Sequence, residues 1–192
     1  FSRMVHSMRC NPPHSQSIAL DMFDGMTRRC FGDLTGVHPT TAQWQQAARG
    51  LAHGGLGLRS CEHHASAAFL ASVGGSLAAC AELDPAFSAD EQKSSPAVSA
   101  ALAHLNAHLP PHQALSVEAA LSSKQRDLSH RVDAAGWAHQ LSQATPIEQA
   151  VLHSEASVGG RAFPAAVPHG AGRMEPAAFC AELRLRLLVP DA

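Results

Sequence analysis

The 192-residue sequence contains no tyrosine, and aromatic residues make up only 5% of it. β-Sandwiches and base-stacking surfaces both use aromatic side chains, so this shortage argues against either. Nearly one residue in five is alanine, which makes the core of large side chains thinner than a hydrophobic fraction of 45% suggests. We therefore predict an all-α fold, an irregular array of short and medium helices with Gly- and Pro-rich connections.

Long apolar runs are also missing. No stretch approaches the roughly 18 uncharged apolar residues that a membrane-spanning helix needs. The first ten residues carry Arg3, His6 and Arg9 where a secretory signal would be apolar. We expect no membrane partner, and an intracellular location, either nuclear or cytoplasmic.

Catalytic motifs are absent as well. There is no adjacent Asp-Asp pair for two-metal phosphoryl transfer, and no Gly-x-Ser-x-Gly, His-Glu-x-x-His or Walker A motif. The pair Gly55 and Gly57 does not complete a dinucleotide-binding motif, because Ser60 stands where the third glycine would be. We assign no catalytic residue in this chain.

The five cysteines form no Cys-x-x-Cys pair. An odd number of widely spread cysteines fits a reducing compartment better than a disulfide framework. The strongest metal-binding pattern is Cys61 with His64, three residues apart on one helical face, with His53 upstream. No spacing nominates Cys80 or His104 as further ligands. We expect a buried cysteine beside exposed histidines, and no metal or other cofactor in this chain.

The charge is divided unevenly along the chain. The net charge is −2, but the residues through Ser60 carry six arginines and three acids, and the remainder carries eight basic and thirteen acidic residues. A surface for an anionic partner is therefore expected only near the N-terminus. The alternative is that these arginines are solvated on helix exteriors.

Proline, glycine and capping patterns divide the first half of the chain into expected helices. The spacing of Ile18, Met22, Met26 and Cys30 predicts an amphipathic helix over 15–31 that buries this stripe. Thr40 with Gln43 forms a capping-box pattern, so a short helix is expected to end near Gly50. A helix capped by Ser60 is expected to stop at 74–75, with a second piece reaching 83.

The second half is expected to begin after a surface connection at 84–96. Helices are predicted over 97–108 and 116–141, the latter being the longest. Thr145, Pro146 and Glu148 combine an N-cap, a first-turn proline and a capping-box acid. A turn is possible around 162–167, and Pro176 opens a last helix that ends before Pro190.

Four short motifs follow one another in the first 60 residues, and their order and spacing resemble those of a known protein family. They are Met8-Arg9-Cys10-Asn11-Pro12-Pro13, Arg28-Arg29-Cys30-Phe31, Trp44-Gln45-Gln46-Ala47 and Gly54-Gly55-Leu56-Gly57-Leu58-Arg59-Ser60. The sequence resembles the region immediately C-terminal to the catalytic palm in reverse transcriptases of non-LTR retrotransposons. The late stretch from Met174 to Pro190 is similar to the helix that precedes a Cys/His cluster in the same proteins. One departure is Ala52 after Leu51, where the family has Leu-Pro.

The resemblance implies a thumb-like helical segment over 1–83 with a Gly-rich loop at 50–60, a linker at 84–96 and a C-terminal helical segment over 97–192. It implies that the palm with its paired aspartates, which would use Mg²⁺, lies before Phe1, and that the Cys/His cluster lies beyond Ala192. The implied function is a non-catalytic contribution to binding RNA or an RNA/DNA template-primer, with the palm of the same polypeptide as a partner. The implied nucleic-acid-binding residues are Arg28, Arg29, Trp44, Gln45, Arg49 and Arg59.

Two other interpretations stay open. The chain could be a stand-alone helical interaction protein or a decayed remnant with no activity, whose arginines only solubilise it. A metalloenzyme using Cys61 and His64 would require stoichiometric zinc. Trp44 and Trp137 are read as core residues rather than base-stacking platforms, because both stand among alanines and leucines at helical positions.

Overall fold

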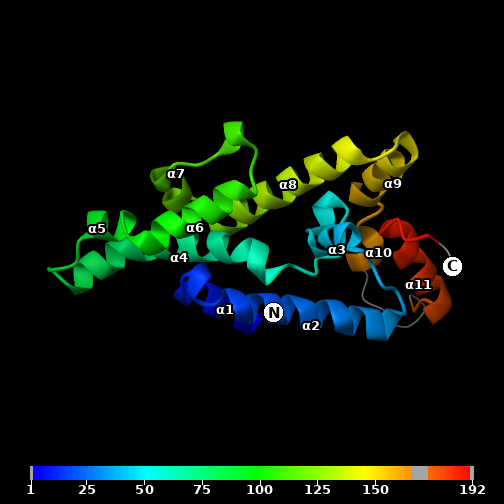
Figure 1. Cartoon of the computed structure of the whole chain (residues 1–192), viewed down its shortest axis with the longest axis horizontal. Helices are drawn as coiled ribbons and strands as arrows, with labels where there is room; N and C mark the ends of the chain where they lie inside the picture. Colours follow the sequence, from blue (N-terminus) through cyan, green and yellow to red (C-terminus); the bar gives the residue numbers. More distant parts are fainter. Residues whose placement is uncertain (1, 166–172, 191–192) are drawn as a thin grey trace. The chain divides into compact units, whose positions relative to one another are not determined.

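The computed structural model describes residues 2–165 and 173–190, and every regular element within these ranges is a helix (Figure 1). The predicted all-α fold is therefore confirmed. The longest helices are α2 (Ser17–Thr35), α4 (Cys61–Leu83) and α8 (Gln125–Gln143). The expected turn around 162–167 begins with the short helix α10 (Ala162–Ala165), and its last two residues lie outside the described residues.

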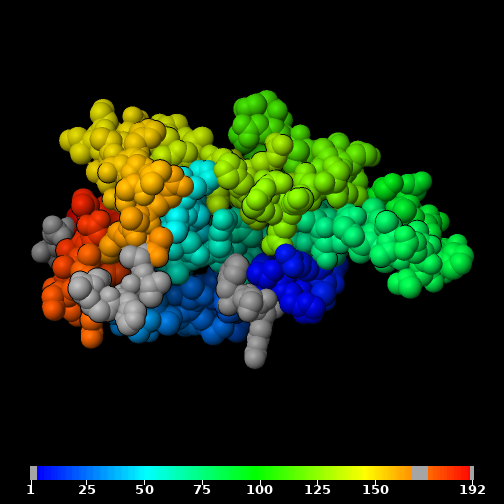
Figure 2. Space-filling view, turned by 180° about the vertical axis from the view of Figure 1, so that it is seen from behind, coloured from blue at the N-terminus to red at the C-terminus, as the bar shows by residue number. Residues whose placement is uncertain are grey.

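The chain divides into two compact units, and each is built from two separate stretches. The first unit contains Phe1–Asp24 and Cys61–Gly136, and the second contains Gly25–Ser60 and Trp137–Ala192. The chain thus passes from one unit to the other within α2, before α4 and within α8. The linker expected at 84–96 lies inside the first unit, at its surface (Figure 2), and includes the short helix α5 (Ala89–Lys93).

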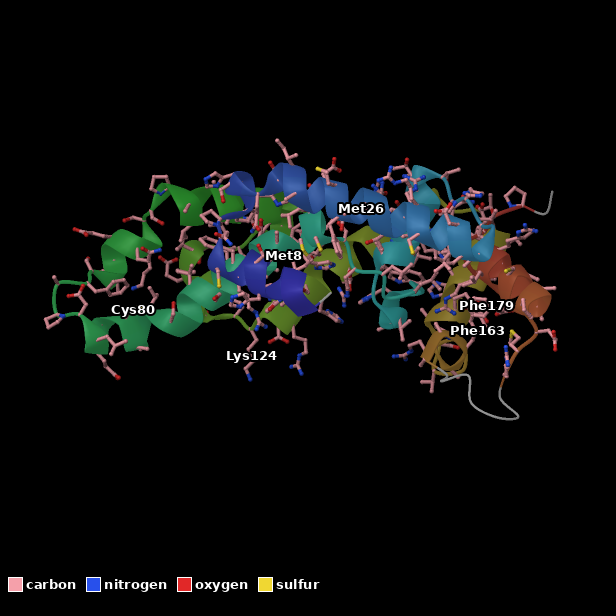
Figure 3. The ribbon with its side chains drawn as sticks, turned by 90° about the horizontal axis from the view of Figure 1, so that it is seen from below. Met8, Met26, Cys80, Lys124, Phe163 and Phe179 are labelled. Atoms are coloured by element: carbon pink, nitrogen blue, oxygen red, sulfur yellow. The ribbon has the colours of Figure 1, made fainter. Side chains whose placement is uncertain are left out.

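In the first unit, α4 is the central helix and packs against α1, α6 and α7. The bounds of these and the remaining elements are α1 (Ser2–Cys10), η1 (Pro13–Ser15), α6 (Pro96–Ala107), η3 (Pro111–Gln113) and α7 (Val117–Ser122). One apolar cluster joins α4, α6, α7 and α8 around Leu70, Leu105 and Leu128. A second joins α1, α2 and α4 around Met8 and Leu20 (Figure 3).

The second unit contains α3 (Thr41–Ala48), η2 (Leu51–His53), α9 (Pro146–Ala156) and α11 (Pro176–Arg186), with parts of α2 and α8. Helix α9 contacts η2 and α11. Phe163 of α10 lies beside Phe179 of α11, with ring centroids 5.4 Å apart (Figure 3). Leu183 and Leu187 are buried, whereas Phe179 is exposed.

Both predicted capping boxes are present. The Thr40 hydroxyl accepts from the Gln43 N–H while the Gln43 side chain accepts from the Thr40 N–H, and Thr145 and Glu148 do the same. In contrast, the start of α4 uses a distant residue that local patterns did not suggest. The Asp24 carboxylate accepts the N–H groups of Cys61 and Glu62 at 2.8 and 3.1 Å. A carboxylate at a helix N-terminus satisfies free amides and complements the helix dipole.

Two predicted helix boundaries were wrong. Helix α4 does not stop at Gly74 but continues to Leu83, because Gly74 allows the helix to approach the backbone of α7 closely. The single helix expected over 116–141 is interrupted at Ser123, which is extended and whose hydroxyl donates to the Ala119 carbonyl. Serine competes with the helix for backbone hydrogen bonds, which explains a break at this point.

The apolar stripe expected to face the core from α2 is exposed instead. Ile18 is 78% exposed, Met22 61% and Met26 50%. The buried residue in this part of the helix is Leu20, which packs with Met8 of α1. The spacing identified a helix correctly but assigned the wrong face to the interior, because two weaker apolar faces share this helix.

The sequence predicts no membrane-spanning helix, but α4 is long and apolar enough to be a candidate for one. By length and composition alone, its 23 residues are enough to cross a membrane, which the sequence search missed because polar residues interrupt the apolar run. Its first half, from Cys61 to Leu70, is largely buried against other helices of the first unit. Helices at the core of globular units share these features, so the helix by itself is weak evidence for a membrane location.

Candidate functional site

The six predicted nucleic-acid-binding residues all belong to the second unit. Arg28 and Arg29 lie on α2, where Arg29 is exposed and the half-buried Arg28 donates to the Pro39 carbonyl. Arg59 is half-buried in the segment before α4. Of the four arginines in the predicted set, these are the three whose side chains are accessible to solvent.

Trp44 and Gln45 lie on α3 and differ in environment. Gln45 is exposed, whereas Trp44 is half-buried with its ring 5.7 Å from the Phe31 ring at a tilt of 57°. A tilted aromatic pair of this kind stabilises the packing between α2 and α3.

Arg49 is only 8% exposed. Its guanidinium lies over the Trp137 ring, 5.9 Å from the centroid, and donates to the Gln140 side chain. The cation–π contact and the hydrogen bond hold the end of α3 against α8. Arg49 therefore reaches a phosphate only if α8 moves away.

The Gly-rich loop folds back onto the end of α3. The N–H groups of Leu56 and Leu58 donate to the Ala47 carbonyl at 3.0 and 3.3 Å, and the Gly57 N–H donates to the Arg49 carbonyl at 2.9 Å. Gly54 and Gly57 have φ values of 67° and 73°, in the left-handed region that favours glycine.

Packing also requires the glycine at position 55. A side chain at Gly55 would collide with the backbone carbonyl of Arg49. A side chain at Gly54 would press on the Trp137 ring, with 3.1 Å between the new Cβ and the nearest ring carbon. The glycines of the motif are therefore explained by the fold, without a ligand.

Arg186 on α11 is the centre of a buried polar network that the sequence reasoning missed. Its side chain is fully buried, pairs with Glu155 of α9 and donates to the carbonyls of Gly160 and Gly55 at 2.8 and 3.2 Å. Its own carbonyl accepts from the buried Gln46 side chain at 2.6 Å. Burial raises the pKa of Glu155, and the Arg186 guanidinium opposes that rise. An arginine with this many carbonyl acceptors is a structural residue.

Cys61 and His64, the strongest metal-binding pattern in the sequence, do not form a common site. Burial and the adjacent Asp24 raise the pKa of the Cys61 thiol to about 12, so the thiolate that a metal needs is disfavoured. His64 is buried beside Asp133, with 3.5 Å between Nε2 and the carboxylate. Cys61 and His64 thus have different carboxylate partners, and His53 belongs to the other unit.

A different group of titratable side chains gathers in the first unit between α4 and α6. It consists of Glu62, His63, His104 and His108. A hydrogen bond from His104 lowers the pKa of Glu62, and burial together with neighbouring imidazoles lowers the pKa of His108 to about 4. The sequence analysis did not identify this group; the spacing of His104 and His108, four residues apart at the end of a predicted helix, is the sequence signal that could have indicated it.

No protein-family model matches the chain, and neither the curated proteins nor the solved structures contain a match to it. The resemblance to reverse transcriptases therefore stays a prediction that depends on its own motifs.

Proposed function

We propose that this chain is the helical thumb and post-thumb part of a non-LTR reverse-transcriptase-like protein, and that its second unit contacts RNA or an RNA/DNA template-primer. The proposal rests on one observation: three of the motifs that carry the resemblance are hydrogen-bonded to one another around Arg186. Gln46 belongs to the Trp-Gln-Gln-Ala motif, Gly55 to the Gly-rich loop and Arg186 to the late stretch, and all three are joined by hydrogen bonds.

This meeting matters because the motifs were identified by order and spacing alone. Residues 46 and 186 are 140 positions apart, yet a side chain of one bonds to the backbone of the other. Separate motifs that build one packed unit are what a genuine family fold would produce. Chance matches in a helical sequence carry no such expectation.

The distribution of charge supports an anionic partner at the second unit. This unit carries eight arginines against six acids, a net of +2, whereas the first unit carries six basic residues against ten acids, a net of −4. Phosphate contacts supply most of the nonspecific affinity for nucleic acids. Arg28, Arg29 and Arg59 are the proposed phosphate contacts, and Arg49 and Trp44 position the helices that carry them.

The proposal extends to the partners of the chain. The palm of the same polypeptide is the proposed protein partner and supplies the catalytic aspartates and Mg²⁺. The proposed location is intracellular, where RNA templates are found. This chain by itself performs no copying step.

Binding of the whole chain to a fluorescent RNA/DNA primer-template, measured by anisotropy over a series of salt concentrations, tests the proposal. The variant carries Arg28→Ala and Arg29→Ala, and the control carries Arg126→Ala, which removes an exposed charge from the first unit. We expect weaker binding in the double variant, with the slope of log K against log salt reduced by about 2, since each lost phosphate contact removes about 0.9. The control should keep the wild-type slope.

Circular dichroism of both variants establishes that they are folded before binding is compared. Wild-type binding that is absent at moderate salt overturns the proposal. Equal binding by the wild type and the double variant overturns the assignment of the two arginines.

The second candidate is a helical interaction protein without nucleic-acid affinity, and the exposed apolar side chains of α2 favour it. Ile18, Met22 and Leu34 are each more than half exposed. Such residues on a soluble chain promote association with another protein or a second copy. This candidate predicts concentration-dependent self-association in light scattering and no salt-sensitive RNA binding.

A further inference from the structure

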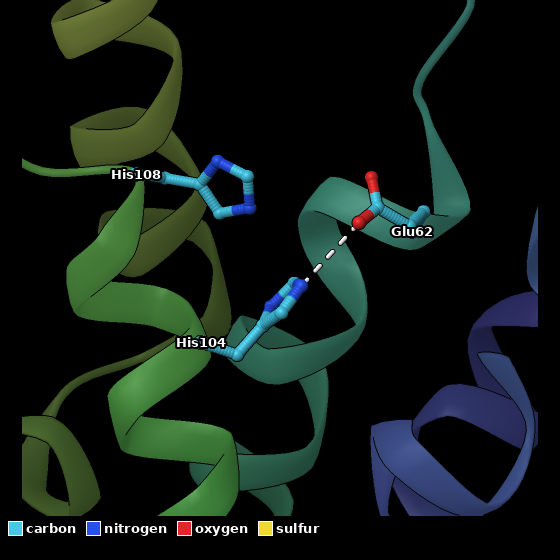
Figure 4. A group of neighbouring side chains, drawn as sticks. All are labelled: Glu62, His104 and His108. Atoms are coloured by element: carbon cyan, nitrogen blue, oxygen red, sulfur yellow. Dashed lines mark hydrogen bonds and ion pairs between the residues drawn. The ribbon is translucent and has the colours of Figure 1, made fainter.

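Three side chains with metal-binding atoms converge in the first unit. Glu62 lies in the first turn of α4, His104 lies on α6, and His108 ends α6 one turn later. The Glu62 carboxylate and His104 Nε2 are 3.3 Å apart, and one ligand atom from each of the three residues lies within 4.8 Å of the others. Figure 4 shows both imidazole rings turned toward the carboxylate.

Neighbouring groups fix the orientation of two of these side chains. The Ser66 hydroxyl is 2.9 Å from His104 Nδ1, which leaves Nε2 directed at Glu62. His63 Nε2 contacts the second Glu62 oxygen at 3.1 Å. Metal-binding histidines usually have their other ring nitrogen held by a hydrogen bond, because this selects the tautomer and the ring orientation.

His108 supplies a second observation at the site, a ring nitrogen that a ligand could satisfy. Its Nε2 is buried and has no hydrogen-bond partner among the described residues. A buried polar atom without a partner is costly and uncommon, so such an atom calls for a ligand. The His108 ring is also packed between two other imidazoles, His63 at 4.8 Å and His104 at 5.0 Å between centroids.

We propose that Glu62, His104 and His108 bind a divalent transition metal of the Zn²⁺ type in the first unit. Two imidazoles and one carboxylate are a ligand set that Zn²⁺ prefers, with the fourth position open to water or another small ligand. This site is different from the Cys61 and His64 pair that the sequence suggested. Its residues belong to the first unit, whereas the arginines of the proposed function belong to the second.

The distances fit this ion after a small adjustment. Tetrahedral Zn²⁺ with bonds of about 2.0–2.1 Å places its ligand atoms about 3.3 Å apart. Glu62 and His104 already have this separation. The ligand atoms now lie within 4.8 Å of one another, so the widest separation must close by about 1.5 Å when the ion binds.

The site has access to solvent and room for a fourth ligand. Glu62 is 43% exposed and His104 is 37% exposed, so an ion can enter from water. Beside them is a cavity of about 200 Å³ whose lining includes Glu62, His104 and Pro13. The cavity walls are largely apolar, which favours a water or a small anion held by the metal over one held by the protein alone.

Zinc binding to the whole chain, measured by isothermal titration after removal of metal with EDTA, tests the proposal. We expect one Zn²⁺ per chain in the wild type, and at least about a tenfold loss of affinity in Glu62→Gln and in His104→Ala, since ligand-shell changes cost 10- to 100-fold. The matched control is His112→Ala, which removes an exposed histidine of the same unit. This control should bind zinc as the wild type does.

Two further measurements keep the test decisive if a variant is poorly folded. Co²⁺ bound at a four-coordinate nitrogen and oxygen site gives visible absorption bands, which Glu62→Gln should lose while its circular dichroism stays unchanged. Zinc should raise the melting temperature of the wild type but not of His104→Ala. The absence of stoichiometric zinc in the wild type overturns the proposal. Binding that survives in both Glu62→Gln and His104→Ala but disappears when thiols are blocked also overturns it, because cysteines are then the ligands.

Discussion

Two adjacent glycines in α4 provide a sensitive test of how the first unit is packed. A Cβ built at Gly74 would lie 1.8 Å from the carbonyl oxygen of Leu121 in α7, whereas a Cβ at Gly75 meets nothing within 4 Å. Both glycines lie well inside the same helix, so their intrinsic cost relative to alanine is nearly the same. Gly74→Ala and Gly75→Ala therefore differ mainly in the contact with α7.

Two opposing effects set the change in the free energy of unfolding in each variant. Replacing a helical glycine by alanine stabilises the folded chain by about 0.5–1 kcal/mol, and Gly75→Ala should show this gain. In Gly74→Ala, α7 must move away from α4 by more than about 1 Å to restore a normal contact, and overpacking of this kind costs about 1–3 kcal/mol or more. The obstacle is backbone, so no rotamer change relieves it. Because the helix-propensity gain is common to both variants, we expect their free energies of unfolding to differ by the overpacking cost, about 1–3 kcal/mol or more.

Urea denaturation followed by far-ultraviolet circular dichroism measures this difference. Gly75→Ala should shift the midpoint to higher urea, and Gly74→Ala should shift it to lower urea, with the slope unchanged in both. If Gly74→Ala is as stable as Gly75→Ala, then α4 and α7 are not in backbone contact at this position. The assigned packing of the first unit would then be wrong.

Two further predictions concern the second unit. Arg186→Met should lower the free energy of unfolding by about 3–5 kcal/mol in chemical denaturation, because it leaves Glu155 buried without its cation, whereas Arg184→Met on the same helix should change it by no more than about 0.5 kcal/mol. Hydrogen bonds from Thr145 lower the pKa of Glu148, so the ionised carboxylate stabilises α9 above the usual glutamate range and this contribution is lost as the pH falls through the lowered pKa. Glu148→Gln keeps the capping geometry without titrating, so the stability difference between it and the wild type should vary only below about pH 4.5; a difference that is constant with pH contradicts this assignment.

The local signals in the sequence were sufficient for the starts of α3 and α9. The capping boxes at Thr40 and Thr145 each lie within four consecutive residues, and their hydrogen bonds depend on no other part of the chain. The low aromatic content and the closely spaced prolines likewise indicated an all-α fold. These features are decided over a few residues, so sequence patterns reach them directly.

Helix ends and buried faces depended on distant contacts, and here the sequence patterns failed. Gly74 carries the same local signal as a helix terminator, but its role is to admit the backbone of α7. On α2, the stripe containing Ile18 and Met22 is more regular than the face containing Leu20, yet Leu20 is the residue that meets Met8. Which face is buried depends on the neighbouring helix, and periodicity within one helix contains no information about it.

The same reasoning applies to the arginines of the candidate interface. In the sequence, Arg29, Arg49 and Arg186 look alike, and only their surroundings separate them. Arg49 has an aromatic ring and an amide as partners, and Arg186 has a carboxylate and several carbonyls, whereas Arg29 is exposed. A guanidinium that already satisfies buried acceptors cannot neutralise a phosphate without leaving them unpaired. The structure thus restricts the proposed phosphate contacts to the accessible arginines.

The proposed metal site was missed for a related reason. The sequence analysis named Cys61 and His64 as the strongest metal-binding pattern, because two ligands on one helical turn are visible in the sequence, and expected no metal there. The residues that converge are their neighbour Glu62 and two histidines from another helix, brought together by the packing of α4 against α6. Because this cluster lies in the first unit and the proposed phosphate contacts lie in the second, loss of zinc binding in His104→Ala and loss of RNA binding on removal of Arg28 and Arg29 are separable results. A variant that abolished both would show that folding of the whole chain, rather than either site, had been disrupted.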